Sequence, residues 1–314
     1  MQSSITPYNA NSPMKPWPTL ADKAFCLNLS FGQTIFYYDV VPPNSGLTPM
    51  IMLIHGLGDE ADSWRHLIPL LNSNGFRVLA LDLPGFGRSA APGRISLKNH
   101  AAAILRLLDA VKIKPDAPVF LVGNSLGAIV AETTAFKKPG LVKGLILMDG
   151  NIPGGPSKIG LFALAKLLFS RKWYRAYRTN PEGAWASLYP YYADLESMSG
   201  ADKDFLRERV MARVNSPTQE RAFFATQRSL IWAFGAGSAG YAQKIRQFKG
   251  KITLLWGEKD RIMPLSTAEP FKTLRNDIEL GIIPGAGHLP QQEKPADTAK
   301  FITEFVNKAV KAVD

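Results

Sequence analysis

A serine between two glycines is the residue of this chain best placed for nucleophilic chemistry. Ser125 lies in the run Gly123-Asn-Ser-Leu-Gly127, after the apolar residues 118–122 and before a helical pattern that starts at residue 128. The glycines let the chain turn sharply, so the serine can adopt a strained conformation with its hydroxyl exposed. A short buried strand, a G-x-S-x-G turn and a helix form the arrangement that presents a nucleophile. A serine hydroxyl barely ionises alone, so this interpretation requires a neighbouring base.

Four histidines could supply that base, and their surroundings differ. His288 follows Pro-Gly-Ala-Gly at 284–287, a loop whose glycines leave it free to reach the serine. Imidazole titrates near neutral pH, which suits proton transfer. His66 and His100 fall in helical patterns and are expected to be surface or packing residues, whereas His55 directly follows a buried strand. We therefore expect His288 to be the base.

Several carboxylates are placed to orient the imidazole. Asp260, Asp149 and Asp82 each follow a segment with the pattern of a buried strand, and Glu258 lies on a turn where it is expected to face solvent. A carboxylate in this role accepts the second imidazole proton and stabilises the imidazolium. The residues alone leave the choice among them open.

These candidate residues lie at the ends of alternating strand and helix patterns. The expected strands are a hairpin over 24–41 and segments 50–54, 77–81, 118–122, 142–148, 252–255 and 278–283. The expected helices are 63–74, 97–111, 265–274 and 296–313, besides the one after the serine. Such alternation predicts an α/β fold with a mostly parallel sheet covered by helices on both faces. In that architecture the site lies beyond the carboxyl ends of the strands.

Three parts of the chain can be distinguished. Residues 150–248 carry no strand pattern and are rich in aromatic residues. We expect a helical cap at 151–248, inserted between the two parts of a core at 24–150 and 249–314. The polar, proline-rich residues 1–23 are expected to form an N-terminal arm that is disordered or wraps the surface.

Composition restricts the class of protein. The chain has 314 residues, 46% hydrophobic and 20% charged, as in ordinary globular proteins, and no apolar run approaches a membrane span. A single cysteine, Cys26, excludes an internal disulfide and offers no metal cluster. The net charge is +11, but no zinc-finger or RNA-binding signature accompanies it, so nucleic acid is not the expected partner. We expect a small-molecule substrate, no metal or organic cofactor and a cytoplasmic location. A homodimer is compatible with the sequence.

Five motifs together resemble the α/β-hydrolase fold family, in its cap-bearing branch, over residues 25–313. They are His55-Gly-Leu-Gly58, Asp82-Leu-Pro-Gly-Phe-Gly-Arg-Ser89, Gly123-Asn-Ser-Leu-Gly127, Trp256-Gly-Glu-Lys-Asp260 and Pro284-Gly-Ala-Gly-His288. The resemblance implies a triad of Ser125, His288 and Asp260, in the chain order Ser…Asp…His. Asp149 is the competing acid, because some relatives carry the acid at that position.

The resemblance also assigns roles to the surrounding loops. His55 is implied to be a structural residue of the oxyanion loop, and Asp82 is implied to order its own turn. The oxyanion hole is implied to consist of the backbone N–H groups of Leu57 and Leu126.

The implied reaction is acyl transfer to water. Relatives that open epoxides or remove halogens use a carboxylate nucleophile where this chain has Ser125. The resemblance therefore implies a serine hydrolase of the carboxylesterase kind, acting on a small-to-medium, partly hydrophobic carboxylic ester. One alternative is a carbon–carbon hydrolase of the meta-cleavage-product type, which acts on an anionic diketo acid and is similar in its Gly-Asn-Ser-x-Gly motif. A receptor of slow turnover on a hydrolase fold is the alternative from another class.

The expected substrate-binding residues are Trp173, Tyr177, Arg175 and Leu289. Residues 151–180 contain no acidic residue and six basic ones, Lys158, Lys166, Arg171, Lys172, Arg175 and Arg178. An arginine here could bind a substrate carboxylate through two hydrogen bonds, or the basic residues could form the solvated faces of cap helices or a surface for anionic lipid. Leu289 departs from the carbon–carbon hydrolases, which usually carry tryptophan after the catalytic histidine.

Overall fold

A single sheet of nine strands organises the part of the chain that the structure describes. The computed structural model describes residues 3–9, 12, 14–43, 48–91, 93–114, 116–150, 171–234 and 240–311. The strands are β1 (Ser4–Pro7), β2 (Ala24–Asn28), β3 (Thr34–Val40), β4 (Met50–Ile54), β5 (Arg77–Leu81), β6 (Val119–Asn124), β7 (Val142–Met148), β8 (Lys251–Gly257) and β9 (Glu279–Ile283). Their order across the sheet is β1-β2-β3-β5-β4-β6-β7-β8-β9. The first three strands run antiparallel to their neighbours, and β5, β4, β6, β7, β8 and β9 are parallel to one another.

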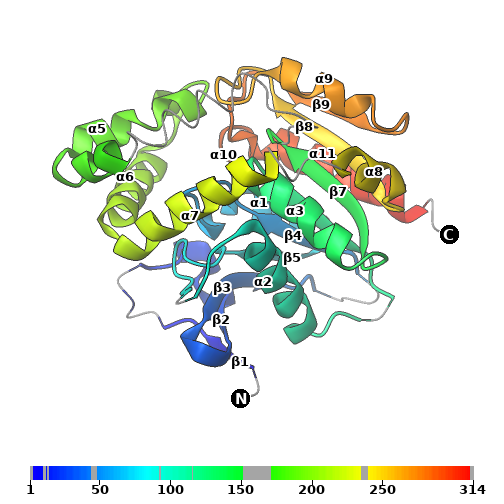
Figure 1. Ribbon diagram of the computed structural model, residues 1–314, viewed down its shortest axis with the longest axis horizontal. Helices are drawn as coiled ribbons and strands as arrows, with labels where there is room; N and C mark the ends of the chain where they lie inside the picture. The colour runs from blue at the N-terminus through cyan, green and yellow to red at the C-terminus, as the bar shows by residue number, and fades with distance from the viewer. Residues whose placement is uncertain are drawn as a thin grey trace.

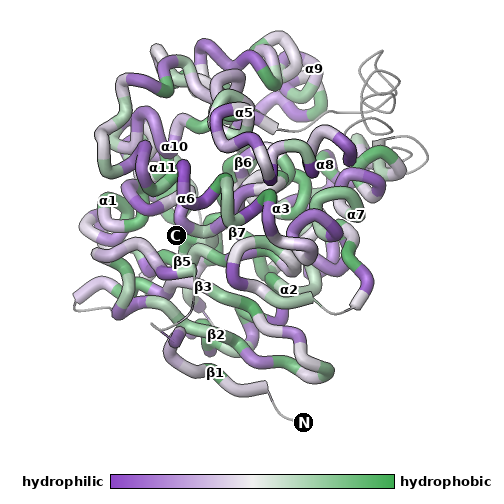
Figure 2. Tube along the Cα trace, turned by 90° about the vertical axis from the view of Figure 1, so that its left-hand side faces the viewer, coloured by the Kyte–Doolittle hydropathy of each residue, from purple (hydrophilic) through white to green (hydrophobic). Residues whose placement is uncertain are grey.

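Helices cover both faces of this sheet, as the sequence predicts. They are α1 (Leu67–Ser73), α2 (Leu97–Ala110), α3 (Leu126–Lys137), α9 (Glu269–Lys272), α10 (Pro290–Glu293) and α11 (Pro295–Lys311). Figure 2 shows α1 and α11 on one side of the sheet and α2 and α3 on the other. Residues of β4 alternate between two separate cores, with Met50, Met52 and Ile54 in one and Ile51 and Leu53 in the other. An apolar run buried on both faces is typical of a central parallel strand.

The segment between β7 and β8 is helical where it is described. It contains α5 (Pro181–Ala186), α6 (Gly200–Asn215), α7 (Pro217–Phe234) and α8 (Tyr241–Gln247), besides short 3₁₀ turns. Figure 1 shows α5 and α6 outside the sheet at the upper left, and α7 running back toward α3. No strand occurs in the described residues 171–234 and 240–250. A separate small core joins this segment to the loop before α10, and it consists of Trp185, Tyr192, Leu195, Leu206 and Leu289.

Three local expectations need correction. The N-terminal arm contributes an edge strand, since β1 pairs with β2. The helix expected at 63–74 is a 3₁₀ turn at Ala61–Trp64 followed by α1, which begins at Leu67. The helix expected at 265–274 is likewise a 3₁₀ turn followed by the four residues of α9. Pro270 stands in the first turn of α9 and has no backbone N–H, so a continuous helix through it would lose a hydrogen bond.

No helix in the described ranges is long and apolar enough to cross a bilayer.

Candidate active site

Ser125 lies at a sharp turn between β6 and α3. Its backbone has φ 55° and ψ −116°, a conformation that is strained for a residue with a side chain. A Cβ on Gly123 would overlap the backbone of Gly127, and a Cβ on Gly127 would overlap the carbonyl of Ile54. The Ser125 N–H donates to the carbonyl oxygen of Met148 at 2.8 Å. The two glycines are therefore required for close packing, and the serine takes the strained position that the motif predicts.

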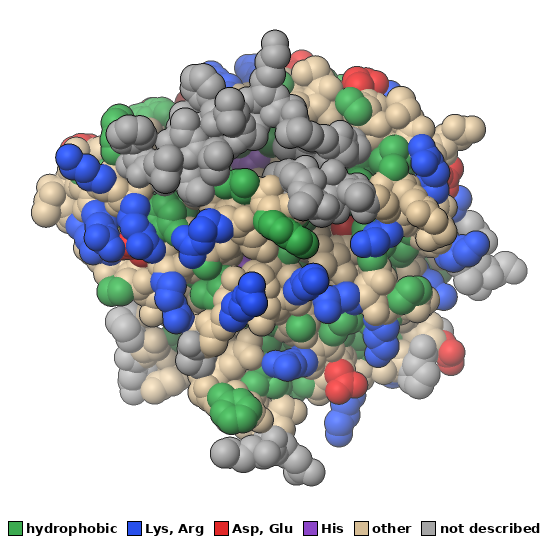
Figure 3. Space-filling model, in the orientation of Figure 1, with side chains coloured by type: hydrophobic (Ala, Val, Ile, Leu, Met, Phe, Trp, Pro, Cys, Tyr) green, Lys and Arg blue, Asp and Glu red, His purple; other side chains and the backbone are tan. Residues whose placement is uncertain are grey.

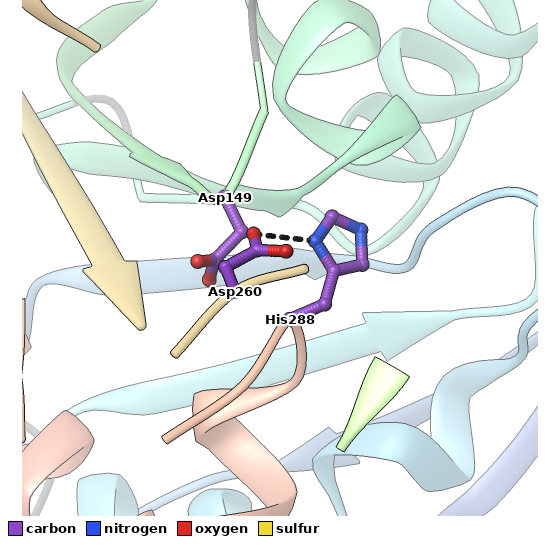
Figure 4. A group of neighbouring side chains, drawn as sticks. All are labelled: Asp149, Asp260 and His288. Atoms are coloured by element: carbon purple, nitrogen blue, oxygen red, sulfur yellow. Dashed lines mark hydrogen bonds and ion pairs between the residues drawn. The ribbon is translucent and has the colours of Figure 1, made fainter. Parts of the chain in front are cut away.

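His288 and Asp260 form a buried pair at the same edge of the sheet (Figure 4). Nδ1 of His288 lies 2.7 Å from Oδ2 of Asp260, and the two side chains are 3% and 0% exposed. The other oxygen, Oδ1, accepts hydrogen bonds from the N–H groups of Ile262 at 2.8 Å and Met263 at 2.9 Å. An ionised carboxylate only accepts hydrogen bonds, so the imidazole proton sits on Nδ1 and the lone pair on Nε2. This tautomer is the one that a general base requires.

Asp149 is the second carboxyl of this group, and its surroundings differ from those of Asp260. It is fully buried, with φ 45°, and its Oδ1 accepts a hydrogen bond from the Gly257 N–H at 2.7 Å. Ligand atoms of Asp149, Asp260 and His288 all lie within 4.8 Å of one another. Burial, and then the negative charge of Asp260, raise the pKa of Asp149 well above its usual range. Burial and the neighbouring Asp260 carboxylate therefore both favour the protonated form of Asp149, whereas Asp260 is hydrogen-bonded to His288.

The same three residues could in principle ligate a cation, but hydrogen bonds already account for their arrangement. His288 Nδ1 and both oxygens of Asp260 are engaged, as is Oδ1 of Asp149. A cation on Nδ1 would have to displace the proton that joins His288 to Asp260.

The loop that carries His288 is held by residues that the sequence analysis does not single out. The Asn124 side chain donates to the His288 carbonyl at 3.0 Å, and the His288 N–H donates to the Tyr191 carbonyl at 2.8 Å. Glu293 accepts hydrogen bonds from the N–H groups of Gly287 and Ala193, each at 2.7 Å. Asn124 stands inside the serine motif and could have been found there. Nothing in the local pattern marks Glu293, because its partners lie 6 and 100 residues away.

The segment after β4 brings its backbone against the serine. His55 Nδ1 lies 2.8 Å from the Gly56 carbonyl, and Nε2 accepts a hydrogen bond from the Leu83 N–H at 2.9 Å. Burial lowers the pKa of His55, so it remains neutral in this structural position. A Cβ on Gly56 would lie 3.5 Å from the Cβ of Ser125. Within the described residues, the N–H groups of Leu57 and Leu126 have no hydrogen-bond acceptor.

The other candidate side chains are engaged elsewhere. Asp82 accepts hydrogen bonds from the Ala61 N–H at 2.7 Å and from Nε of Arg88 at 2.8 Å, which orders its turn. Glu258 is exposed and accepts from the Gly285 N–H. His66 pairs with Asp202 of α6, and the buried His100 lies 2.9 Å from Thr226 of α7. Both of the packing histidines therefore contact helices of the 171–248 segment.

The expected substrate-binding arginine has a partner within the protein. Arg171, Arg175 and Arg178 converge on Glu220 with N···O distances of 3.2, 2.8 and 2.7 Å. Sequence spacing could not reveal this carboxylate, which lies on α7. These ion pairs show that the arginines have a partner within the protein, and their binding of a substrate carboxylate stays a prediction. Lys158 and Lys166 lie outside the described residues.

The remaining expected substrate-binding residues differ in exposure. Trp173 is 67% exposed, and Tyr177 is half-buried. Leu289 is buried in the core with Trp185 and Tyr192, and it thus packs the 171–248 segment against the loop that carries His288.

Comparison with known proteins agrees with the architecture. The family described as alpha/beta hydrolase fold matches residues 49–295. Epoxide hydrolase 3 of Xenopus tropicalis is 26% identical over 268 residues, which cover 83% of this chain and 72% of the relative. Pimeloyl-[acyl-carrier protein] methyl ester esterase of Methylococcus capsulatus is 28% identical over 269 residues, 83% of this chain and 96% of the relative. The 2-hydroxy-6-oxo-6-(2'-aminophenyl)hexa-2,4-dienoic acid hydrolase of Metapseudomonas resinovorans is 27% identical over 263 residues, 82% of this chain and 84% of the relative.

These relatives include an ester hydrolase and a hydrolase of a meta-cleavage product. The family match spans most of the chain, and it includes the serine turn, Asp260 and His288. The chain belongs to the alpha/beta hydrolase fold family.

Proposed function

We propose that this protein is a serine hydrolase that cleaves a small-to-medium, partly hydrophobic carboxylic ester through an acyl-enzyme. The observation that carries the proposal is the buried His288–Asp260 pair at the sheet edge where Ser125 stands at its strained turn. The polarised imidazole and a strained serine are the two parts that such chemistry needs.

The proposed reaction proceeds in two halves. The Ser125 hydroxyl oxygen attacks the ester carbonyl carbon while its proton passes to Nε2 of His288. The N–H groups of Leu57 and Leu126 hold the negative charge on the carbonyl oxygen, and Asp260 stabilises the imidazolium. Collapse expels the alcohol, which takes the proton from His288. A water molecule then repeats the sequence on the acyl-enzyme, releasing the acid and restoring Ser125.

The comparisons supply one competing substrate class. The relative from Metapseudomonas resinovorans is named for a dienoic acid. Recognition of such an anion needs a cation that can reach it, and Glu220 already binds the three cap arginines. Epoxide opening would need a carboxylate in the place of Ser125. The ester is therefore the substrate class that the described residues support best.

A nitrophenyl ester series of increasing acyl length tests the proposal. Wild type should hydrolyse at least one ester of the series, and Ser125→Ala should lower kcat for that ester by about four orders of magnitude or more. Ser73→Ala is a matched control, since Ser73 is exposed and hydrogen-bonds within its own helix to Leu70. It should keep wild-type rates.

Three outcomes would contradict the ester proposal. Turnover that survives in Ser125→Ala would show that Ser125 is not the nucleophile. Cleavage of a vinylogous diketo acid at a higher kcat/KM than any ester would favour carbon–carbon hydrolysis. Stoichiometric acylation of Ser125 without turnover would favour the slow receptor.

A further inference from the structure

A large groove lies on the face formed by α2, α3, α7 and α8, and its lining includes none of Ser125, His288 or Asp260. Its volume is about 1140 Å³. Since α7 and α8 belong to the 171–248 segment and α2 and α3 to the core, the groove spans the junction of the two. Ligand pockets are commonly of about 300–1,000 Å³, so this space is large enough for a lipid-sized molecule.

The floor of the groove is apolar. Ile95 and Leu97 are buried beneath it, and Ile129, Phe136 and Ala225 are partly exposed toward it. Trp232 lines it too and is 62% exposed, which is unusual for so large an apolar side chain. No local sequence pattern marks this surface, because its residues come from four separate helices.

Basic side chains line the same groove. They are Arg94, Lys98, Lys137, Arg221, Arg228 and Lys244. Figure 3 shows basic side chains spread over the face on which α2, α3 and α7 lie, with apolar side chains among them. Glu132 is the one acidic residue among the described residues of the lining; it is buried and accepts a hydrogen bond from Tyr241, and burial raises its pKa to about 8. At neutral pH the lining therefore carries a strong positive charge.

This charge is not balanced within the described part of the chain. Arg94, Lys98, Lys137, Arg228 and Lys244 form no ion pair there. The contrast with Arg171, Arg175 and Arg178 is direct, because those arginines share Glu220. Cations beside apolar surface, with no acid among the described residues to neutralise them, are complementary to a ligand with a negative head and an apolar chain.

We propose that this groove binds a single-chain anionic amphiphile, namely a long-chain carboxylate, with its chain on the apolar floor and its head among the basic side chains. The proposal goes beyond the ester hydrolysis proposed above and does not depend on it. Such a ligand would contact α2 and α3 of the core together with α7 of the cap segment. It would thereby stabilise one placement of α7 against the core.

Calorimetric titration of the full chain with dodecanoate below its micelle concentration tests this site. The groove variant is the triple Lys98→Gln, Lys137→Gln, Lys244→Gln, all exposed lysines of the lining. The matched control is the triple Lys143→Gln, Lys249→Gln, Lys300→Gln, which are exposed, outside the groove and equal in charge change. Dodecanoate should bind the groove variant at least roughly tenfold more weakly than wild type, and the control within about twofold of wild type. Trp232→Ala should weaken binding by a further factor of several.

Two additional arms distinguish binding in the groove from binding elsewhere on the protein. Blocking Ser125 with a small phosphonate should leave dodecanoate affinity unchanged, and dodecanol should bind at least roughly tenfold more weakly than dodecanoate. Loss of binding on blocking Ser125 would place the ligand in the active site and overturn the proposal. If both triple variants bind dodecanoate equally weakly, the effect comes from the net charge of the protein and not from the groove. Binding of phosphatidylglycerol vesicles without binding of monomeric dodecanoate would make this face a membrane contact instead.

Discussion

Two buried clusters of carboxylates lie at the same edge of the sheet, and they differ in the nitrogen-bearing side chains that partner the carboxylates. The imidazole cluster consists of Asp149, Asp260 and His288, on the loops that follow β7, β8 and β9. The arginine cluster consists of Glu60, Asp62, Asp82, Arg88 and Arg209, from the loops after β4 and β5 and from α6. Burial is nearly complete in both.

Arginine keeps its proton at any pH at which proteins fold, so neither arginine of this cluster can act as a general base or acid. Arg88 contacts Asp62 and Asp82 at 2.8 Å each. Burial works against the charge of Asp82, but the contacts of Arg88 outweigh it and hold the pKa of Asp82 below its usual range. Arg209 lies 3.2 Å from Glu60 and thus ties α6 to the core. The arginine cluster is structural.

The other cluster contains an imidazole where the arginine cluster has guanidinium groups, and imidazole is the side chain that most readily exchanges protons near neutral pH. Burial raises the pKa of Asp149, so Asp260 and His288 are the pair of this cluster that is arranged for proton transfer. Two similarly buried clusters thus differ in role: the arginine cluster holds α6 against the core, and the imidazole cluster contains the pair arranged for proton transfer.

Asparagine substitutions at the two aspartates of the imidazole cluster should separate their roles most strongly. Asp260→Asn should lower kcat by about four orders of magnitude, because an amide favours the wrong imidazole tautomer. Asp149→Asn should lower kcat by no more than about tenfold, because asparagine keeps an oxygen that can accept the hydrogen bond from Gly257. Steady-state ester hydrolysis measures both. The opposite ranking would make Asp149 the acid of the triad.

Removal of one arginine should damage stability and not the chemistry. Arg209→Met should lower the free energy of unfolding by roughly 3–5 kcal/mol, since it leaves buried carboxylates without their partner. Urea unfolding measures this change, and Arg246→Met, an exposed arginine of α8, is the control. A decrease in the free energy of unfolding below about 1 kcal/mol would show that the arginine cluster contributes little to stability.

Glu293 should matter through the position of His288. Glu293→Ala removes the acceptor that joins Gly287 to Ala193, and kcat should fall by roughly tenfold to a hundredfold with little change in KM. Glu293→Gln keeps one accepting oxygen where the carboxylate uses two, so it can keep one of these hydrogen bonds and should recover part of the rate. If the alanine and glutamine variants lose activity equally, the carboxylate has some role other than hydrogen-bonding these N–H groups.

Glu132 offers a third case, a buried carboxyl whose hydrogen bond comes from the Tyr241 hydroxyl. Burial raises its pKa to about 8 from 4.5, so between these values the folded state binds more protons than the unfolded state. Stability should therefore fall as pH rises from about 5 to about 8, by about 1 kcal/mol per pH unit. Glu132→Gln should flatten this slope in unfolding curves at several pH values. An unchanged slope would assign the pH dependence to other groups.

The sequence predicts the parallel strands and the site loops well, because both depend on local pattern. The apolar run of β4 and the glycines around Ser125 mark their structures directly. Partners that are distant in the sequence are not marked in this way. Glu220 pairs with Arg175 from 45 residues away, and the polar residues of β1 form a strand only because β2 offers them an edge. The raised pKa of Asp149 depends on burial beside Asp260, which no local pattern encodes.

Labelling with a fluorophosphonate, followed by mass spectrometry, tests most directly whether His288 activates Ser125. Ser125 should carry one adduct per chain. The adduct should form at least a hundredfold more slowly in His288→Ala than in wild type, and at nearly the wild-type rate in Asp149→Asn. An adduct on another residue, or labelling of Ser125 at an unchanged rate in His288→Ala, would contradict this activation.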